Sequence, residues 1–205
     1  MVQNSIIERK NTGLLIVVSG PSGVGKGTIN ERIVEKFNAW KSVSMTTRNP
    51  REGEVDGVDY YFVNDEEFEN RIKDNNFIEY AKYNDKYYGT PKDKLIEHMN
   101  EGIDSILEIE VQGAKNIKDM FSDAILIYIV PPSYSALRDR LLNRATESRE
   151  EIENRMRIAR KEIEYLDIYD YVIVNDDLEK AISDVVGIIN SEKLRTKRII
   201  DVHLD

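Results

Sequence analysis

The sequence contains no cysteine and only two histidines, His98 and His203, which stand far apart. The lack of thiols excludes disulfides and zinc–thiolate sites, and two isolated histidines argue against a histidine-based metal centre. Apolar runs are short as well, and none approaches the roughly 18 residues that a membrane-spanning helix requires. The run Leu14–Val18 is too short for the core of a signal peptide. We therefore expect a cytoplasmic protein without a membrane partner.

Acidic residues outnumber basic ones, and the formal net charge is −9 at pH 7. This balance argues against a broad surface for binding a nucleic-acid polymer. The arginines are nevertheless unevenly placed, and half of them lie between Arg138 and Arg160. We expect a bound anion to be held by this segment and by a glycine-rich loop near the N-terminus.

Strand-like and helix-like segments alternate along the chain, which predicts an α/β fold with a parallel sheet flanked by helices. The hydrophobic content of 40% is ordinary for a globular protein. Buried strands are predicted at residues 14–19, 104–110, 124–130 and 171–175, and helices at 26–37, 112–121, 133–143 and 176–193.

Two segments interrupt this alternation. Residues 47–90 are rich in turns, with a short helix at 65–73 and a hairpin at 77–88, and they predict a small β-rich insertion. Residues 134–165 are helical and rich in arginine. A sheet with two such excursions is typical of an enzyme with closing parts. The remaining residues, 1–46, 91–133 and 166–205, are assigned to the core.

Two capping boxes predict helix starts. Thr90-Pro91-Lys92-Asp93 combines a capping threonine with proline at the first helical position, and its helix should end at Gly102. Ser148 and Glu151 form the second box, at the start of a helix that runs to about residue 165. The charged residues after 193 are predicted to be exposed.

The segment SGPSGVGKGT follows the apolar run LLIVV and precedes a predicted helix. Residues 20–26 match G-x-x-x-x-G-K, in which glycines let the backbone wrap phosphates and the lysine reaches the β- and γ-phosphates of a nucleotide. A plain glycine-rich turn would explain the glycines but not a lysine at this spacing. The predicted nucleotide-binding residues of this loop are Gly20, Pro21, Ser22, Gly23, Val24, Gly25, Lys26, Gly27 and Thr28.

One position departs from the motif, which places Ser or Thr after the lysine to hold Mg²⁺. The residue there is Gly27, and the hydroxyl comes one position later, at Thr28. We expect either that Thr28 takes this role or that Mg²⁺ is held largely through water and the phosphates.

The turn-rich segment SMTTRNPREGE contains two arginines, and tyrosines follow it at positions 60, 61 and 88. Guanidinium groups and phenol hydroxyls can hold a phosphate dianion through charge-assisted hydrogen bonds. A solvated, charged turn is an equally good interpretation of this segment taken alone.

The segments SGPSGVGKGT, SMTTRNPREGEVDGVDYYFV, FIEYAKYNDKYYGTP, ILEIEVQGA and VIVNDDLEKA follow one another as in guanylate kinases, and the chain resembles that family over about residues 12–192. The TTR-x-PR-x-GE segment is far more specific than the phosphate-binding loop. The resemblance implies a P-loop core, a GMP-binding insertion and a lid. It also implies transfer of a phosphoryl group from ATP to GMP, and by extension dGMP, with Mg²⁺ as cofactor.

The resemblance assigns GMP-binding roles to individual residues. The GMP phosphate would be held around Arg48 and Arg51, and the guanine would be read by Glu79 and Thr90. Glu110 stands near the guanine, where the family usually has Asp. The implied GMP-binding residues are Ser44, Arg48, Arg51, Glu54, Tyr60, Glu79, Tyr88, Thr90 and Glu110.

The chemistry of guanine independently fits a carboxylate at Glu79. Guanine presents two donors on one edge, N1–H and the 2-amino group, and one carboxylate accepts both. Adenine places an acceptor at this edge, and a buried carboxylate left unpaired costs several kcal/mol, so AMP would be rejected. A lone glutamate on a hairpin is, however, more commonly an outward charge.

The resemblance places Arg140, Arg144 and Arg155 in the lid, where they close on ATP, and Asn175 near the adenine. Arg140 and Arg144 are four residues apart on one predicted helix and share a face. Salt bridges to nearby glutamates are the alternative role for lid arginines, and for that reason Arg149, Arg157 and Arg160 are left out of the site. The predicted catalytic residues are Lys26, Arg48, Arg140, Arg144 and Arg155.

Phosphoryl transfer requires two anions held in line and their repulsion offset. A side-chain base is not needed, because the attacking phosphate oxygen is already ionised. Two other functions remain open. One is a guanylate-kinase-like scaffold module that binds phosphorylated peptides, although such modules tend to lack an intact phosphate loop. The other is a kinase for a different nucleoside monophosphate, against which Glu79 and Thr90 argue.

Overall fold

The computed structural model describes residues 7–83, 85–143 and 149–202. Its larger body is built on five strands: β2 (Leu15–Ser19), β3 (Trp40–Lys41), β8 (Ser105–Glu108), β9 (Ile125–Val130) and β10 (Tyr171–Val174). Neighbouring strands are all parallel, in the order β10-β9-β2-β8-β3. Parallel strands need long crossover connections, which the helices between them supply. The predicted α/β class is confirmed.

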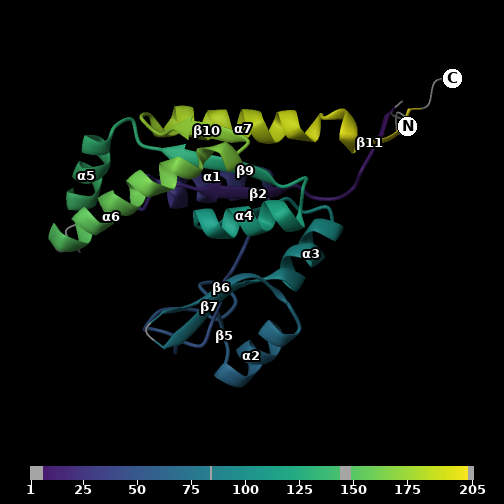
Figure 1. Ribbon diagram of the computed structural model, residues 1–205. Coiled ribbons are helices and arrows are strands. Elements are labelled where there is room, and N and C mark those ends of the chain that lie inside the picture. Colours follow the sequence, from purple (N-terminus) through teal and green to yellow (C-terminus); the bar gives the residue numbers. More distant parts are fainter. Residues whose placement is uncertain (1–6, 84, 144–148, 203–205) are drawn as a thin grey trace.

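Different helices cover the two faces of this sheet (Figure 1). Alternate residues of a strand point to opposite faces, so Ile16 enters one hydrophobic core and Val17 enters the other. The first core is shared with α1 (Lys26–Phe37) and α7 (Leu178–Lys193), and the second with α3 (Lys92–Asn100) and α4 (Val111–Met120).

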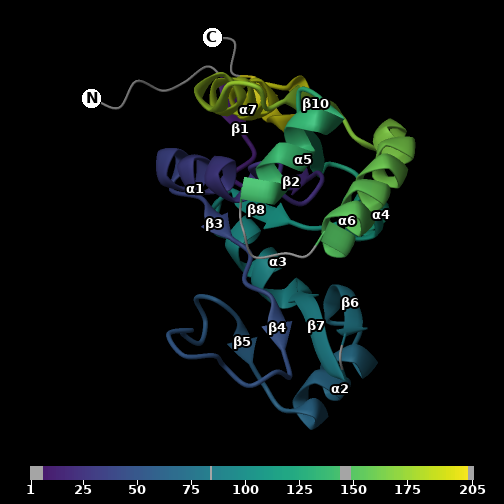
Figure 2. The ribbon, with the colours of Figure 1, turned by 90° about the vertical axis from the view of Figure 1, so that its left-hand side faces the viewer.

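A second, smaller body lies below α4 in the view of Figure 1. The helix α3 connects it to the larger body (Figures 1 and 2). The smaller body contains a four-stranded sheet in the order β5-β4-β7-β6, with α2 packed beside it. Its small core is built on Met45, Phe68 and Phe77, and the two phenyl rings stack with centroids 4.4 Å apart. Its elements are β4 (Met45–Thr46), β5 (Tyr61–Phe62), α2 (Asp65–Lys73), β6 (Phe77–Tyr83) and β7 (Lys86–Pro91).

Two helices project beside the larger body, α5 (Tyr134–Asn143) and α6 (Arg149–Glu162), and a 3-10 segment at Ile163–Ile168 follows them. They pack on each other through a separate apolar cluster that includes Leu141 and Met156. Ser133 begins α5 as expected, because its Oγ accepts a hydrogen bond of 3.1 Å from the N–H of Ala136. The second predicted capping residue, Ser148, lies outside the described residues.

The capping box predicted at Thr90 is wrong. Thr90 belongs to β7, which continues to Pro91, and α3 begins at Lys92 without a side-chain cap from its own sequence. Asn76 caps the helix instead: its carbonyl accepts from the N–H of Lys92 at 3.0 Å, and its Oδ1 accepts from the N–H of Asp93 at 3.1 Å. The hydroxyl of Thr90 is therefore available for a different partner, described below.

The tail after residue 193 is largely exposed over its described part, as predicted, but it also forms two regular elements. Thr196–Arg198 forms a 3-10 turn, and β11 (Ile199–Val202) pairs antiparallel with β1 (Ile7–Arg9). This two-stranded ribbon brings residues 7–9 beside residues 199–202, as Figure 1 shows. Within the described ranges, no helix is long and apolar enough to span a bilayer.

Candidate active site

The glycine-rich loop connects β2 to α1 at the carboxyl edge of the parallel sheet. Gly20, Gly23 and Gly25 have φ values of 145°, 88° and 101°, which side chains other than glycine rarely adopt. Space is also restricted, because a Cβ on Gly20 would lie 2.3 Å from the carbonyl oxygen of Ile129. The loop therefore closes over the strand ends through backbone alone, directly before the first turn of α1.

Lys26 is the first residue of α1 and folds back over the loop. Its Nζ donates hydrogen bonds to the carbonyls of Gly20 at 2.7 Å and Pro21 at 3.2 Å, and it lies 4.0 Å from Glu108 Oε1. Asn30, one turn further along α1 and fully buried, donates to Glu108 Oε2 at 3.0 Å. Glu108 was not among the predicted site residues. It is the last residue of β8 and lies two positions before the predicted residue Glu110.

The outer side of the loop is held by two residues from distant segments. The amide Nδ2 of the buried Asn175 donates to the carbonyl of Val24 at 2.7 Å. Arg140, from α5, donates to the carbonyl of Asn175 at 2.9 Å and to that of Val24 at 3.4 Å. Asn175 and Arg140 thus both contact the glycine-rich loop in this structure. Arg144 lies outside the described residues.

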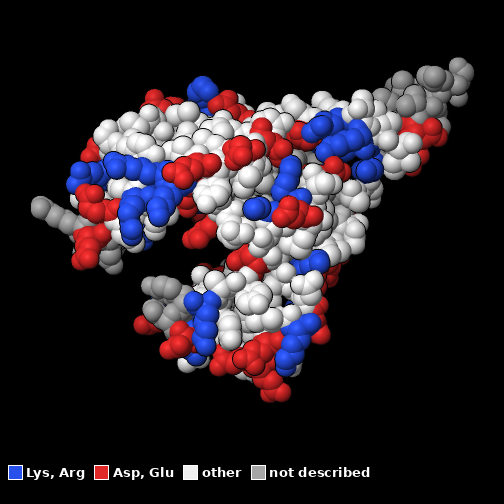
Figure 3. All heavy atoms as spheres, in the orientation of Figure 1, with Lys and Arg blue, Asp and Glu red and all other residues white. Residues whose placement is uncertain are grey.

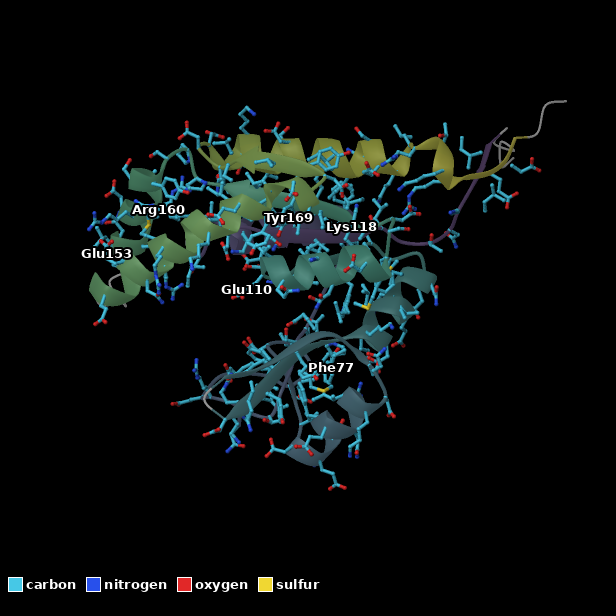
Figure 4. The ribbon with its side chains drawn as sticks, viewed as in Figure 1. Phe77, Glu110, Lys118, Glu153, Arg160 and Tyr169 are labelled. Atoms are coloured by element: carbon cyan, nitrogen blue, oxygen red, sulfur yellow. The ribbon has the colours of Figure 1, made fainter. Side chains whose placement is uncertain are left out.

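A cavity of about 620 Å³ opens beneath the loop. Figure 3 shows a hollow between the arginine-rich helices and the smaller body, and Figure 4 shows Glu110 on the side of the larger body that faces that hollow. Arg155 reaches the loop from α6 and donates to the hydroxyl of Ser22. The cavity is lined by Gly20, Pro21, Ser22, Gly23, Gly25, Lys26, Gly27, Thr28, Glu31, Glu108, Ile109, Glu110, Arg155, Ile158, Ala159 and Glu162.

Glu162, at the end of α6, is a second cavity residue that the sequence analysis missed. It accepts a hydrogen bond of 3.3 Å from the hydroxyl of Tyr128, a fully buried residue of β9. Burial raises the pKa of Glu162, the charge of Glu110 raises it further, and Lys26 opposes the shift. Many charged residues surround Glu162 in the sequence, so no local pattern indicates that this glutamate, and not another, lines the cavity.

The first cluster of the smaller body surrounds Arg48. Its guanidinium donates to both carboxylate oxygens of Glu54, at 2.8 and 2.9 Å, and lies over the ring of Tyr60 at 5.3 Å. The hydrogen bond from Arg48, followed by one from the N–H of Arg51, lowers the pKa of Glu54. The rings of Tyr60 and Tyr88 lie 6.1 Å apart. The turn therefore folds around an ion pair and leaves the Arg51 side chain exposed.

The second cluster joins the two strands of the hairpin. The hydroxyl of Thr90, only 1% exposed, donates to Glu79 Oε1 at 2.7 Å. Burial raises the pKa of Glu79, the hydrogen bond from Thr90 opposes this, and the charge of Glu110 raises the pKa further. Glu79 is thus a half-buried carboxylate, not an outward charge. Ser44 lies nearby at the entry to β4, where its carbonyl accepts from the N–H of Tyr61 at 2.9 Å.

A divalent metal has few protein ligands at this site. The exposed Thr28 lines the cavity beside Lys26 and offers one hydroxyl. Among the described residues, no group of three or more His, Cys, Asp or Glu side chains is arranged to hold a metal ion. Such a donor set fits an ion that keeps most of its water and takes further oxygens from nucleotide phosphates, as Mg²⁺ commonly does.

Comparisons with known proteins identify the family of this chain. The guanylate kinase family model matches residues 12–192. A curated guanylate kinase of Clostridium tetani (strain Massachusetts / E88) is 50% identical over 189 residues, covering 92% of this chain and 91% of the relative. A crystal structure of guanylate kinase from Anaplasma phagocytophilum superimposes with a TM-score of 0.71 at 34% identity, covering 96% of this chain and 93% of that one.

The fold also occurs in a different setting. The SH3-kinase fragment of tight junction protein 3 superimposes with a TM-score of 0.51 at 9% identity, covering 92% of this chain and 61% of that one. This likeness concerns the fold alone. The 50% identity to a guanylate kinase over nearly the whole chain, together with the family match, carries the assignment. The chain belongs to the guanylate kinase family.

Proposed function

We propose that the guanylate kinase reaction, transfer of the γ-phosphoryl group of ATP to GMP, takes place in the 620 Å³ cavity, with residues 47–90 as the GMP-binding insertion and 134–165 as the lid. One observation carries this proposal. The cavity is lined both by the phosphate-binding loop and by Glu110, whose charge acts on Glu79 of the smaller body. Both substrates would therefore meet in one space.

ATP would bind with its phosphates on the loop. The N–H groups around Gly23 and Gly25 and the N-terminus of α1 supply a positive potential for phosphate oxygens. Lys26 would exchange its bonds to the Gly20 and Pro21 carbonyls for bonds to the β- and γ-phosphates. Asn175 would stay on the outer side of the loop, near the adenine.

GMP would bind from the smaller body. Arg48, held by Glu54 and backed by Tyr60, presents a fixed guanidinium for the phosphate. The other residues proposed to bind the GMP phosphate are Ser44, Arg51 and Tyr88. Glu79 would accept from N1–H and the 2-amino group of guanine, with Thr90 and Glu110 beside it. The substrate dGMP is included in the proposal, because none of these groups is assigned to the ribose.

The chemical step needs charge and alignment more than proton transfer. The attacking oxygen of GMP is already ionised, so the residues have to offset repulsion between two anions. Lys26, Arg140 and Arg155 already contact the loop, and Arg144 would join them as the lid closes. A divalent metal bound with ATP, proposed here as Mg²⁺, would neutralise further phosphate charge next to Thr28.

A panel of nucleotides tests this proposal. ADP release should be fast with GMP and dGMP and at least about a hundredfold slower, in kcat/KM, with AMP, CMP and UMP. Omission of Mg²⁺ should abolish the activity. Comparable turnover of AMP and GMP would show that the carboxylate of Glu79 does not read the base. Binding of GMP without any turnover would instead support a scaffold module. A cytoplasmic location and the absence of polymer or membrane partners stay predictions.

A further inference from the structure

A glycine of the larger body lies against the side chain of Glu79, the residue of the smaller body that is proposed to read guanine. Gly113 is buried in the first turn of α4, and α4 packs on β6, which carries Glu79. A Cβ placed on Gly113 would lie 3.2 Å from Glu79 Cγ and 3.2 Å from Ile109 Cδ1. Figure 1 shows α4 on the side of the larger body that faces the smaller body. The bare helix surface at Gly113 thus provides the room that the Glu79 side chain occupies.

Glu79 is held at a second point further along its side chain. Thr90, which is almost fully buried, donates to Glu79 Oε1 at 2.7 Å. The methylene contact with α4 and the hydrogen bond at the carboxylate therefore restrict the same side chain from two different bodies. A side chain at position 113 would force Glu79 or Ile109 to move by a few tenths of an ångström, because a contact of 3.2 Å is tighter than most Cβ contacts.

We infer that Gly113 is a positioning residue for base recognition: its lack of a side chain sets where the Glu79 carboxylate stands, and so sets the affinity for GMP. This inference rests on the proposed role of Glu79. Hydrogen bonds weaken steeply with distance and angle, so a small displacement of the carboxylate weakens both bonds to guanine. Gly113 is not among the residues that line the cavity at the glycine-rich loop, so the loop should be unaffected.

The test compares two helical glycines. Gly113→Ala should raise the KM for GMP about tenfold, the effect of weakening charge-assisted hydrogen bonds. The kcat at saturating GMP and the KM for ATP should stay within about twofold. Gly187→Ala is the matched control, because Gly187 lies exposed in α7 with nothing within 4 Å of an added Cβ. Both variants gain the same helix propensity, so thermal unfolding separates stability from binding.

A double-mutant cycle then tests whether the effect passes through Glu79. In a Glu79→Ala background the Cγ is missing, so adding Gly113→Ala should cause no further loss with GMP. An equal loss in both backgrounds would overturn the inference, as would unchanged GMP kinetics in Gly113→Ala. If Glu79→Ala alone leaves the KM for GMP unchanged, the proposed role of Glu79 fails independently of Gly113.

Ile109 is the other neighbour of the added Cβ, and it supplies a second variant. Ile109→Val/Gly113→Ala removes the Cδ1 contact and keeps the contact with Glu79. Measured against Ile109→Val alone, this pair should retain the tenfold rise in the KM for GMP. If the double variant shows no rise in the KM for GMP, the effect belongs to Ile109 and the inference is overturned. The shorter valine side chain also makes room for the added methyl group, so the test stays usable if Gly113→Ala alone folds poorly.

Discussion

The phosphate-binding loop and the smaller body are built on opposite principles. The loop shapes its surface from backbone, with Gly20, Gly23 and Gly25 in conformations that glycine adopts readily. The smaller body uses side chains that come from separate strands and turns, such as the pair of Arg48 with Glu54 and that of Thr90 with Glu79. A backbone site depends on the local chain, whereas a side-chain site depends on how distant segments pack.

This difference predicts which properties each region controls. The loop should govern ATP and the chemical step, and the smaller body should govern GMP affinity and base choice. Variants in the two regions should therefore separate kcat from the kinetic constants for GMP.

The largest effect is expected for Lys26→Ala. Removing the cation that offsets developing phosphate charge should lower kcat by about a thousandfold, while GMP still binds with an affinity within about twofold of the parent. Steady-state kinetics and calorimetric GMP titration provide the two measurements. Lys36→Ala, in the exposed last turn of the same helix, is the control. Near-normal turnover of Lys26→Ala would contradict the loop assignment.

Arg48→Ala should act on the other substrate. Loss of the guanidinium removes a proposed phosphate ligand and leaves Glu54 without its ion-pair partner, so kcat/KM for GMP should fall on the order of a hundredfold with little change in the KM for ATP. Arg71→Ala is the control, because Arg71 pairs with Asp93 and Glu67 at the surface of the same body. An effect confined to ATP would mean that the two nucleotide sites have been exchanged.

Glu79→Gln should change base choice. One acceptor becomes an NH₂ donor facing a guanine donor, which should cost about 2–4 kcal/mol with GMP, whereas the amide can pair with N1 of adenine. The AMP-to-GMP ratio of kcat/KM should therefore rise by about two orders of magnitude. Glu69→Gln, on the exposed surface of α2, serves as reference. An unchanged ratio would leave Glu79 without a role in base reading.

The smallest effect is expected from pH. Burial raises the pKa of Glu79, assisted by the charge of Glu110 and opposed by Thr90. Guanine needs the carboxylate form, so acidification should raise the KM for GMP already above the usual glutamate pKa of about 4.3, by about tenfold per pH unit once the proton is bound. Glu79→Gln should lack this rise. Matching pH profiles for the two proteins would assign the titration to another group.

Local signals predicted the elements of the larger body well. The helix at 26–37 and the strand ending at Ser19 were expected from apolar periodicity and were found with nearly the same bounds. The start of α3 was predicted to within one residue, but its capping residue was wrong, because Asn76 caps the helix and Thr90 bonds to Glu79 instead. The ribbon of β1 and β11 was missed for the same reason: its pairing joins opposite ends of the chain.

The site divides in the same way. The spacing of glycines and lysine predicted the conformation of the loop between β2 and α1, because the φ values it needs are readily available to glycine. Tertiary structure alone decided that Glu108 and Glu162 line the cavity, that Asn175 and Arg140 hold the loop from outside, and that Gly113 lies against Glu79. These contacts join residues far apart in sequence, and their distances follow from how the sheets and helices pack, which no local pattern encodes.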